Sequence, residues 1–189
     1  MSQKRTPDFR KPYYLLKGND RQKLAFEVLR TLRILDVLAD YDPVLTGTIP
    51  IDVDLPGSDL DIICEWPEDD QFEPIIRDHY GLQPDFQLRH YTILGLDTIV
   101  ANFRFTSTGT GPEGFPIEIF GHNLPVEHQM AYRHMRKEYE ILQARDESFR
   151  ADVRALKDTG HSTEAAFALL LDIPGDPYVN LLTYELPSD

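Results

Sequence analysis

The chain of 189 residues has a single cysteine, Cys64, and no long apolar run. One cysteine excludes an internal disulfide framework and is typical of a reducing compartment. The apolar runs are too short to cross a bilayer, and the N-terminus leads into polar sequence instead of an apolar signal segment. We therefore expect a cytoplasmic protein that is neither secreted nor embedded in a membrane.

Basic residues are few, because 19 Lys and Arg stand against 32 Asp and Glu, which gives a net charge of −13. A chain this acidic repels nucleic-acid phosphates unless its cations are gathered in one patch. The cations between residues 133 and 157 are interspersed with acids, which is typical of a solvated helix surface. Nucleic acid is therefore not an expected partner, and small phosphorylated substrates fit this charge better.

Two acids on one short predicted strand, Asp59 and Asp61, are the most informative feature that is present. Side chains alternate across a strand, so these two share one face while Leu60 and Ile62 share the other. Two carboxylates this close repel each other, and a divalent cation relieves the repulsion. Mg²⁺ is commonly held by one or two carboxylates plus substrate phosphates. We therefore predict that these acids bind Mg²⁺ or Mn²⁺.

A third acid, Glu118, is the only charge in the apolar run from Phe115 to Phe120. A charge that faced the core without a partner would be strongly destabilising. On an edge strand, Glu118 would point to solvent. On a strand beside that of Asp59 and Asp61, the three acids would form a cage for a cation, and the paired acids favour this second interpretation.

The predicted elements give an α/β (α+β) fold with a mixed α/β amino half and a helical carboxyl half. We expect helices at about 21–38, with a break near Arg33, and at 67–79, a loop at 49–56, and strands at 44–46, 59–64, 86–93, 98–107 and 115–120. Beyond Gly121, helices are expected at about 126–144, 147–157, 163–171 and after Asp176. A mixed sheet flanked by helices would thus occupy residues 1–124, and a helical region, residues 125–189, would pack on it.

The histidines do not predict a zinc site. His128 and His134 are not at a metal-ligand spacing on one helix, and no cysteine or second close histidine completes a set. The run Asp176-Pro177-Tyr178 is expected first to begin a helix, and only second to border a substrate cleft.

The order of these features resembles the polymerase-β-type nucleotidyltransferase superfamily. The matching stretches are Thr46-Gly47-Thr48, then ten residues, then Asp59-Leu60-Asp61-Ile62, and later Ile117-Glu118-Ile119. More closely, the whole chain resembles a small bacterial family of unknown function that is placed in this superfamily. That resemblance rests on residues 43–50, 57–65, 116–121 and 175–178. It implies a nucleotidyltransferase-like fold without a known substrate.

The superfamily resemblance implies an in-line displacement at the α-phosphorus of an NTP. Asp59 and Asp61 would hold two Mg²⁺ ions, and Glu118 would complete the second ion site or act as the base. The turn at Gly47 would bring backbone N–H groups close to the phosphates, and the hydroxyls of Thr48 and Ser58 would donate hydrogen bonds. Ser58 follows a glycine, so a role as a turn former explains it equally well.

The chain departs from the superfamily pattern in two places. Thr48 stands where many members have Ser, and the loop at 49–56 has two prolines, two acids and no Lys or Arg. Phosphate charge would have to be met by metal ions, by backbone N–H groups or by cations from elsewhere. Arg104, Arg133 and Arg136 are candidates for this role, but a surface salt bridge is the favoured interpretation of each.

Three functions are consistent with these features. The first is Mg²⁺-dependent transfer of a nucleoside monophosphate from an NTP to a small molecule or protein. The second is a non-catalytic module that binds a nucleotide or a partner, as in a toxin–antitoxin pair, and the third is a metal-dependent phosphohydrolase. The three acids favour catalysis, because unpaired inward acids destabilise a fold that binds no metal. The nucleotide, the acceptor and the oligomeric state are not fixed by the sequence.

Overall fold

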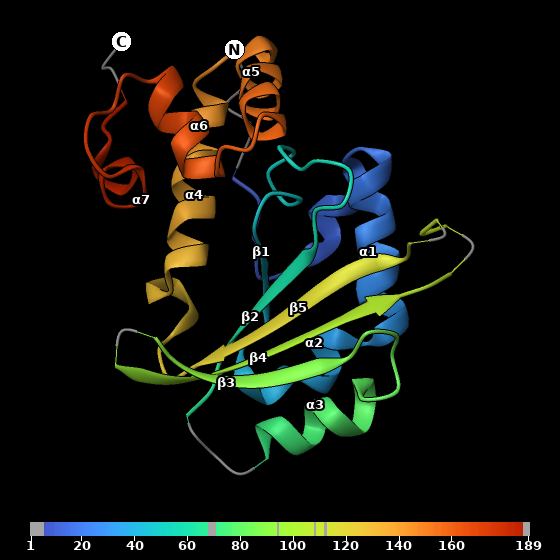
Figure 1. The fold of residues 1–189 in the computed structure, drawn as a ribbon. Coiled ribbons are helices and arrows are strands. Elements are labelled where there is room, and N and C mark those ends of the chain that lie inside the picture. The colour runs from blue at the N-terminus through green and yellow to red at the C-terminus, as the bar shows by residue number, and fades with distance from the viewer. Residues whose placement is uncertain (1–5, 68–70, 94, 108, 112, 187–189) are drawn as a thin grey trace.

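The computed structural model describes residues 6–67, 71–93, 95–107, 109–111 and 113–186. A sheet runs through the lower part of the molecule in Figure 1, with α1 and α2 behind it and the C-terminal helices gathered above it. In the described residues, none of the helices combines the length and apolar character that a bilayer crossing requires.

Five strands form one mixed sheet with the spatial order β1-β2-β5-β4-β3 in the described part of the chain. In that order, the strands span Val44–Thr46, Leu60–Glu65, Phe115–His122, Leu96–Phe105 and Gln87–Ile93. β2 and β5 run parallel, and the other neighbours are antiparallel. Because all five expected strands are present in one mixed sheet flanked by helices, the predicted fold class is confirmed.

Helices α1 (Asp20–Leu32), α2 (Ile34–Val37) and α3 (Phe72–Tyr80) pack on one face of the sheet. Their apolar side chains form the main core with inward residues of the strands, among them Leu60, Ile62, Ile117 and Ile119. The predicted break is confirmed at Arg33, which adopts a left-handed conformation with φ 54° between α1 and α2. The acidic start expected for α3, at 68–70, lies outside the described residues.

The carboxyl half contains α4 (Met130–Gln143), α5 (Glu147–Asp158), α6 (Thr163–Leu170) and α7 (Pro177–Asn180). The helix expected from residue 126 begins only at Met130, after a 3-10 turn at Val126–His128. Gln129 interrupts it in an extended conformation, and its side chain donates hydrogen bonds to the carbonyl oxygens of Cys64 at 2.9 Å and Leu124 at 2.8 Å. The break therefore fixes the beginning of α4 to the end of β2.

A second apolar cluster lies among the C-terminal helices. It combines Met135, Val153 and Phe167 with two residues of the 49–56 loop, Ile51 and Val53. The loop is therefore held between the sheet and the helices. The division of the chain into residues 1–124 and 125–189 stays a prediction.

Candidate functional site

A row of polar residues crosses the sheet on the face opposite α1–α3. Thr46 pairs with Asp61, Asp61 with Glu118, Glu118 with Asn102, and Asn102 with Gln87. Residues that are paired directly across neighbouring strands have side chains on the same face. The register thus places Asp61 and Glu118 side by side near the middle of the sheet, with Asp59 just before β2.

Glu118 lies on an interior strand, because β5 has β2 on one side and β4 on the other. The alternative of an edge strand is therefore wrong. Its side chain is half-buried, and Oε2 accepts a hydrogen bond of 3.0 Å from Nδ2 of Asn102. This bond holds one oxygen of the Glu118 carboxylate toward β4, on the side of β5 away from Asp61.

The carboxyl group of Asp61 is strongly perturbed. Burial first, and then the charges of Asp59 and Glu118, raise the pKa of Asp61 to about 8. The charge of Lys157 acts in the opposite direction. The three acids are thus close enough to disfavour ionisation of Asp61, and a divalent cation relieves this kind of repulsion.

Gly47 lies directly against the Asp61 carboxylate. Its φ is +78°, and a Cβ added there would lie 2.1 Å from Oδ2 of Asp61. No other residue type fits this position without displacing that carboxylate. The turn after β1 and the acid on β2 are therefore packed as one unit, and the hydroxyl of Thr46 joins them by donating to the carbonyl oxygen of Asp61 at 3.3 Å.

Thr48 and Ser58 border this unit on the loop side. The carbonyl oxygen of Thr48 accepts a hydrogen bond from the Val53 N–H at 3.2 Å. Ser58 exchanges two hydrogen bonds with Leu55, because its N–H donates to the Leu55 carbonyl and its Oγ accepts from the Leu55 N–H, each at 3.0 Å. These contacts are those of a turn former, and a role for either hydroxyl in nucleotide binding stays a prediction.

Three cations on one face of α5 hold the 49–56 loop. Arg150 donates to the carbonyl oxygen of Ile51 at 2.6 Å, Arg154 to that of Asp52, and Lys157 to that of Val53 at 2.6 Å. The interpretation of these residues as a solvated helix surface is therefore wrong. The signal in the sequence was their spacing of four and three residues, which places them on one face of a helix.

Arg104 forms an ion pair of 3.3 Å with Asp85 and donates to the carbonyl oxygen of Glu113 at 2.8 Å. Arg133 and Arg136 lie on the exposed side of α4. Among these candidates and the α5 cations, Lys157 is the one whose charge acts on Asp61.

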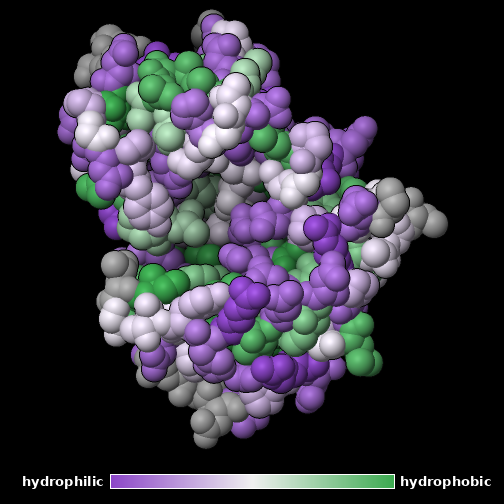
Figure 2. Space-filling model, viewed as in Figure 1, coloured by the Kyte–Doolittle hydropathy of each residue, from purple (hydrophilic) through white to green (hydrophobic). Residues whose placement is uncertain are grey.

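A pocket of about 330 Å³ opens beside the polar row. Its lining comes from Asp59, Asp85, Gln87, Asn102, Phe103, Arg104, Pro116 and Ile117. Figure 2 shows that hydrophilic residues cover much of this side of the molecule and that a recess separates the helical part from the sheet. Of the three acids, Asp59 lines this pocket, and Asn102, the partner of Glu118, lies in its wall.

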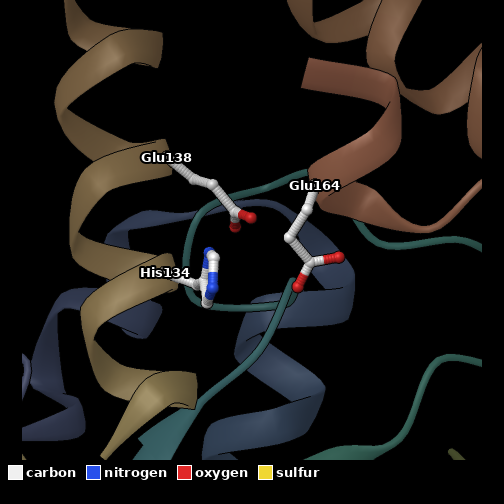
Figure 3. A group of neighbouring side chains, drawn as sticks. All are labelled: His134, Glu138 and Glu164. Atoms are coloured by element: carbon white, nitrogen blue, oxygen red, sulfur yellow. The ribbon is translucent and has the colours of Figure 1, made fainter. Parts of the chain in front are cut away.

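A second group of chemically competent side chains lies between α4 and α6, where His134, Glu138 and Glu164 point toward one another (Figure 3). Their ligand atoms all lie within 4.8 Å of one another. The residues considered in the sequence as partners of His134 were cysteine and histidine only, and the two residues that lie beside it are glutamates. The spacing of His134 and Glu138 was visible in the sequence, but Glu164 comes from a separate helix and gave no signal.

A family model for a domain of unknown function, DUF4269, matches residues 27–184. The chain belongs to the DUF4269 family. A comparison with curated proteins finds no match.

Three solved structures show what the DUF4269 fold is similar to. They are the Cid1 poly(U) polymerase with MgGTP bound (TM-score 0.51, 14% identity, 77% of this chain and 46% of that one), the GLD-2/RNP-8 complex (0.52, 11%, 85% and 63%) and the polymerase core of TRAMP, an RNA surveillance complex (0.53, 14%, 88% and 57%). At these identities the likeness shows the fold alone, and it confirms the nucleotidyltransferase-like fold that the resemblance implied. The chain spans less than two thirds of each of them.

Asp61→Asn should stabilise the metal-free protein, and more so at high pH. The pKa of Asp61 is about 8 in the folded protein and 3.8 in the unfolded chain. The folded protein is therefore not penalised below pH 3.8, where Asp61 is protonated in both states, and it loses stability as the pH rises from 3.8 through 8. Asparagine has no charge to bury, so we expect a gain of about 1–3 kcal/mol near pH 9, or roughly 2–4 °C for each kcal/mol, and little gain near pH 5. Thermal melts in EDTA at both pH values measure the difference.

Glu65→Gln is the matched control, since Glu65 lies on the same strand and face as Asp61 but pairs with His122 at the far end. Equal effects of Asp61→Asn at the two pH values would show that the carboxyl of Asp61 titrates normally in the fold.

Proposed function

We propose that this protein is a divalent-metal-dependent nucleotidyltransferase that moves a nucleoside monophosphate from an NTP to an acceptor hydroxyl. The observation that supports this most is the pairing of Asp61 with Glu118 on adjacent parallel strands, with Asp59 next to them and the Gly47 turn packed against them. The similarity of the fold to nucleotidyltransferases supports the same class of reaction.

The acids fit divalent ions such as Mg²⁺ or Mn²⁺. Oxygen ligands from carboxylates are what these ions prefer, and the raised pKa of Asp61 marks a carboxyl whose ionised form lacks sufficient positive charge nearby. Asp59, Asp61 and Glu118 would hold the metal. When bound, the ions would offset phosphate charge and lower the pKa of the attacking hydroxyl.

The remaining roles belong to side chains and backbone around the acids. Asn102 holds the Glu118 carboxylate at 3.0 Å, so Glu118 is positioned to accept the proton of an acceptor hydroxyl. The absence of a Cβ at Gly47 leaves the backbone of the turn open to close approach by phosphate. Thr48 and Ser58 border this turn, and their hydroxyls are assigned to nucleotide contacts.

Lys157 is the residue we assign to phosphate charge. It is half-buried, it acts electrostatically on Asp61, and its position is fixed by the hydrogen bond to the carbonyl oxygen of Val53 at 2.6 Å. The cation that the loop itself lacks is thus supplied by α5. A lysine is suited to this role as a compact point charge.

The acceptor is proposed to be a small molecule or a protein, with the pocket beside Asn102 and Gln87 as its approach. The net charge of −13 weighs against long nucleic acids. The similar structures, however, include a poly(U) polymerase and the core of an RNA surveillance complex, so a short RNA belongs among the acceptors to be tested. A reducing cytosol as the location stays a prediction from the single cysteine.

Incubation with each α-labelled NTP and Mg²⁺ or Mn²⁺ tests the proposal. Transfer predicts pyrophosphate together with a labelled acceptor, because the α-phosphorus keeps the label while the leaving group departs unlabelled. A free labelled monophosphate as the product, with no labelled acceptor, would instead identify a phosphohydrolase. Nucleotide binding without turnover of any NTP would identify a non-catalytic module, and either result would overturn the transferase.

A further inference from the structure

His134, Glu138 and Glu164 form a compact group that the proposed transfer reaction does not use. His134 and Glu138 lie one helical turn apart on α4, and Glu164 lies in the first turn of α6 (Figure 3). The side chains of His134 and Glu138 are buried, with 4% and 3% exposure. The donor atoms of all three residues lie within 4.8 Å of one another.

The imidazole of His134 has no partner in its buried position. Neither Nδ1 nor Nε2 makes a hydrogen bond within the described residues, although the ring points toward the two carboxylates. Buried polar atoms without partners are rare and costly. Burial lowers the pKa of His134, and the charge of Glu164 acts in the opposite direction. The neutral ring therefore offers a free lone pair to the centre of the group.

The carboxyl of Glu138 also lacks a counter-charge in contact. Burial first, and then the charge of Glu164, raise the pKa of Glu138 to about 8. Lys157 acts in the opposite direction but forms no ion pair within 4 Å of it in the described part of the chain, and its ammonium donates instead to the carbonyl oxygen of Val53. The group thus combines two carboxylates and an imidazole, which are typical metal ligands, with no cationic side chain among them.

Tyr178 covers this group from α7. Its ring centroid lies 4.5 Å from that of His134, while 47% of the residue remains exposed. Asp176 holds it there, because Oδ1 of Asp176 accepts a hydrogen bond of 2.9 Å from the Tyr178 N–H. The run at 176–178, whose role the sequence left open, therefore forms the outer wall of the group, and Glu164 and Tyr178 mark its side toward solvent.

We propose that His134, Glu138 and Glu164 bind one divalent transition-metal ion, with Zn²⁺ as the best fit, which joins α4 to α6. An imidazole with two carboxylates is a donor set that suits Zn²⁺, whereas Mg²⁺ and Ca²⁺ prefer oxygen ligands alone. Bonds of about 2.0–2.2 Å in a tetrahedral site place ligand atoms about 3.4 Å apart, so the donor atoms would approach one another by up to about 1.4 Å through rotation of the glutamate side chains. A fourth position remains for water on the side of Glu164.

The consequence of this site is structural and separate from the acids of the sheet. The metal would neutralise the buried carboxylate of Glu138 and the partly exposed one of Glu164, and it would satisfy the His134 ring at once. Because it joins two helices of the second core, it would stabilise the helical part that holds the 49–56 loop through α5. The proposal does not depend on the transferase reaction, since Asp59, Asp61 and Glu118 belong to a different group of residues.

Zn²⁺ titration of metal-stripped full-length protein, in excess Mg²⁺ to occupy the sheet acids, tests the site. We expect one equivalent to bind and to raise the melting temperature. Glu138→Gln keeps the shape of the side chain and should weaken Zn²⁺ binding by about 100-fold or more, since it removes a ligand. Glu140→Gln is the matched control on the exposed side of the same helix and should bind as the wild type does. Co²⁺ in place of Zn²⁺ should give a visible absorption band in the wild type and none in Glu138→Gln.

Glu164→Gln provides a second test on α6 should Glu138→Gln fail to fold, and it should show the same loss. Asp61→Asn should leave Zn²⁺ binding unchanged, which separates this site from the proposed active site. Equal Zn²⁺ affinity in Glu138→Gln and Glu140→Gln would overturn the proposal, as would the absence of Zn²⁺ binding by the wild type. In that case, His134 and the two acids would form a metal-free cluster around a protonated carboxyl.

Discussion

Asp61→Asn is expected to reduce nucleotidyl transfer by about a thousandfold or more, because loss of a shared metal ligand removes several kcal/mol of transition-state stabilisation. Asp61 is paired with Glu118 across the sheet and is close enough to Asp59 and Glu118 to be affected by the charges of both, so its carboxylate is the one we expect to matter most for holding the ions. The amide keeps the size of the side chain but cannot carry the charge. The rate of pyrophosphate release from the preferred NTP measures the effect.

The control for this prediction is again Glu65→Gln. It removes one negative charge from the same strand and sheet face, opposite His122 and away from the acids. Its rate should match that of the wild type. If both variants kept the wild-type rate, the measured transfer would arise elsewhere, and if both lost it equally, the effect would come from general charge and not from a metal ligand.

The acids of the sheet were predictable because the information that places them is local. The alternation in Asp59-Leu60-Asp61-Ile62 fixes which side chains share a face, and an isolated charge in an apolar strand points to a polar environment. The order of the strands in the sheet, by contrast, does not follow from the local sequence. Asn102 and Gln87 continue the same row only because β4 and β3 pair with β5 in this register. A polar residue on a half-exposed strand does not by itself indicate that it belongs to a functional site.

The role of α5 could not be predicted for a different reason. Its amphipathic spacing was visible, but the partners of Arg150, Arg154 and Lys157 are backbone carbonyl oxygens of a distant loop. Every residue has such a carbonyl group, so no side-chain pattern marks the loop as a partner. Arg104 was one candidate source of phosphate charge, and the structure shows it in an ion pair with Asp85, as the favoured interpretation of this residue had it.

The group around His134 shows the same limit. A histidine and a glutamate four residues apart share one helix face, so the proximity of His134 and Glu138 could be inferred from the sequence. The third member, Glu164, begins another helix, and only the packing of α6 against α4 brings it within reach. Only histidine and cysteine were considered as partners of His134 in the sequence, although carboxylates are also ordinary ligands of transition metals.

Gly47→Ala is expected to be among the most damaging single substitutions in the chain. The new Cβ would lie 2.1 Å from Oδ2 of Asp61, and φ at this residue is +78°. We expect a loss of about 2–4 kcal/mol of unfolding free energy, of which roughly 1 kcal/mol reflects the left-handed backbone and the rest the displaced carboxylate. We expect Mg²⁺ or Mn²⁺ to raise the melting temperature of the wild type by binding to the folded protein, and this rise should be absent in Gly47→Ala, because its displaced carboxylate no longer faces Glu118.

A double-mutant cycle with Asp61→Ala separates the two causes of that loss. Asp61→Ala removes the oxygen that the Cβ of Gly47→Ala would meet, so Gly47→Ala in this background should cost only about 1 kcal/mol, the backbone part. Denaturant unfolding of the four proteins gives the coupling energy. Thr48→Val, one residue further on, tests the neighbouring hydroxyl: it should leave stability nearly unchanged and weaken nucleotide binding by roughly 1–3 kcal/mol if Thr48 donates to phosphate. Equal costs of Gly47→Ala with and without the Asp61 carboxylate would mean that the turn and the acid are not packed as one unit, and the geometry on which the proposed ion site depends would then be wrong.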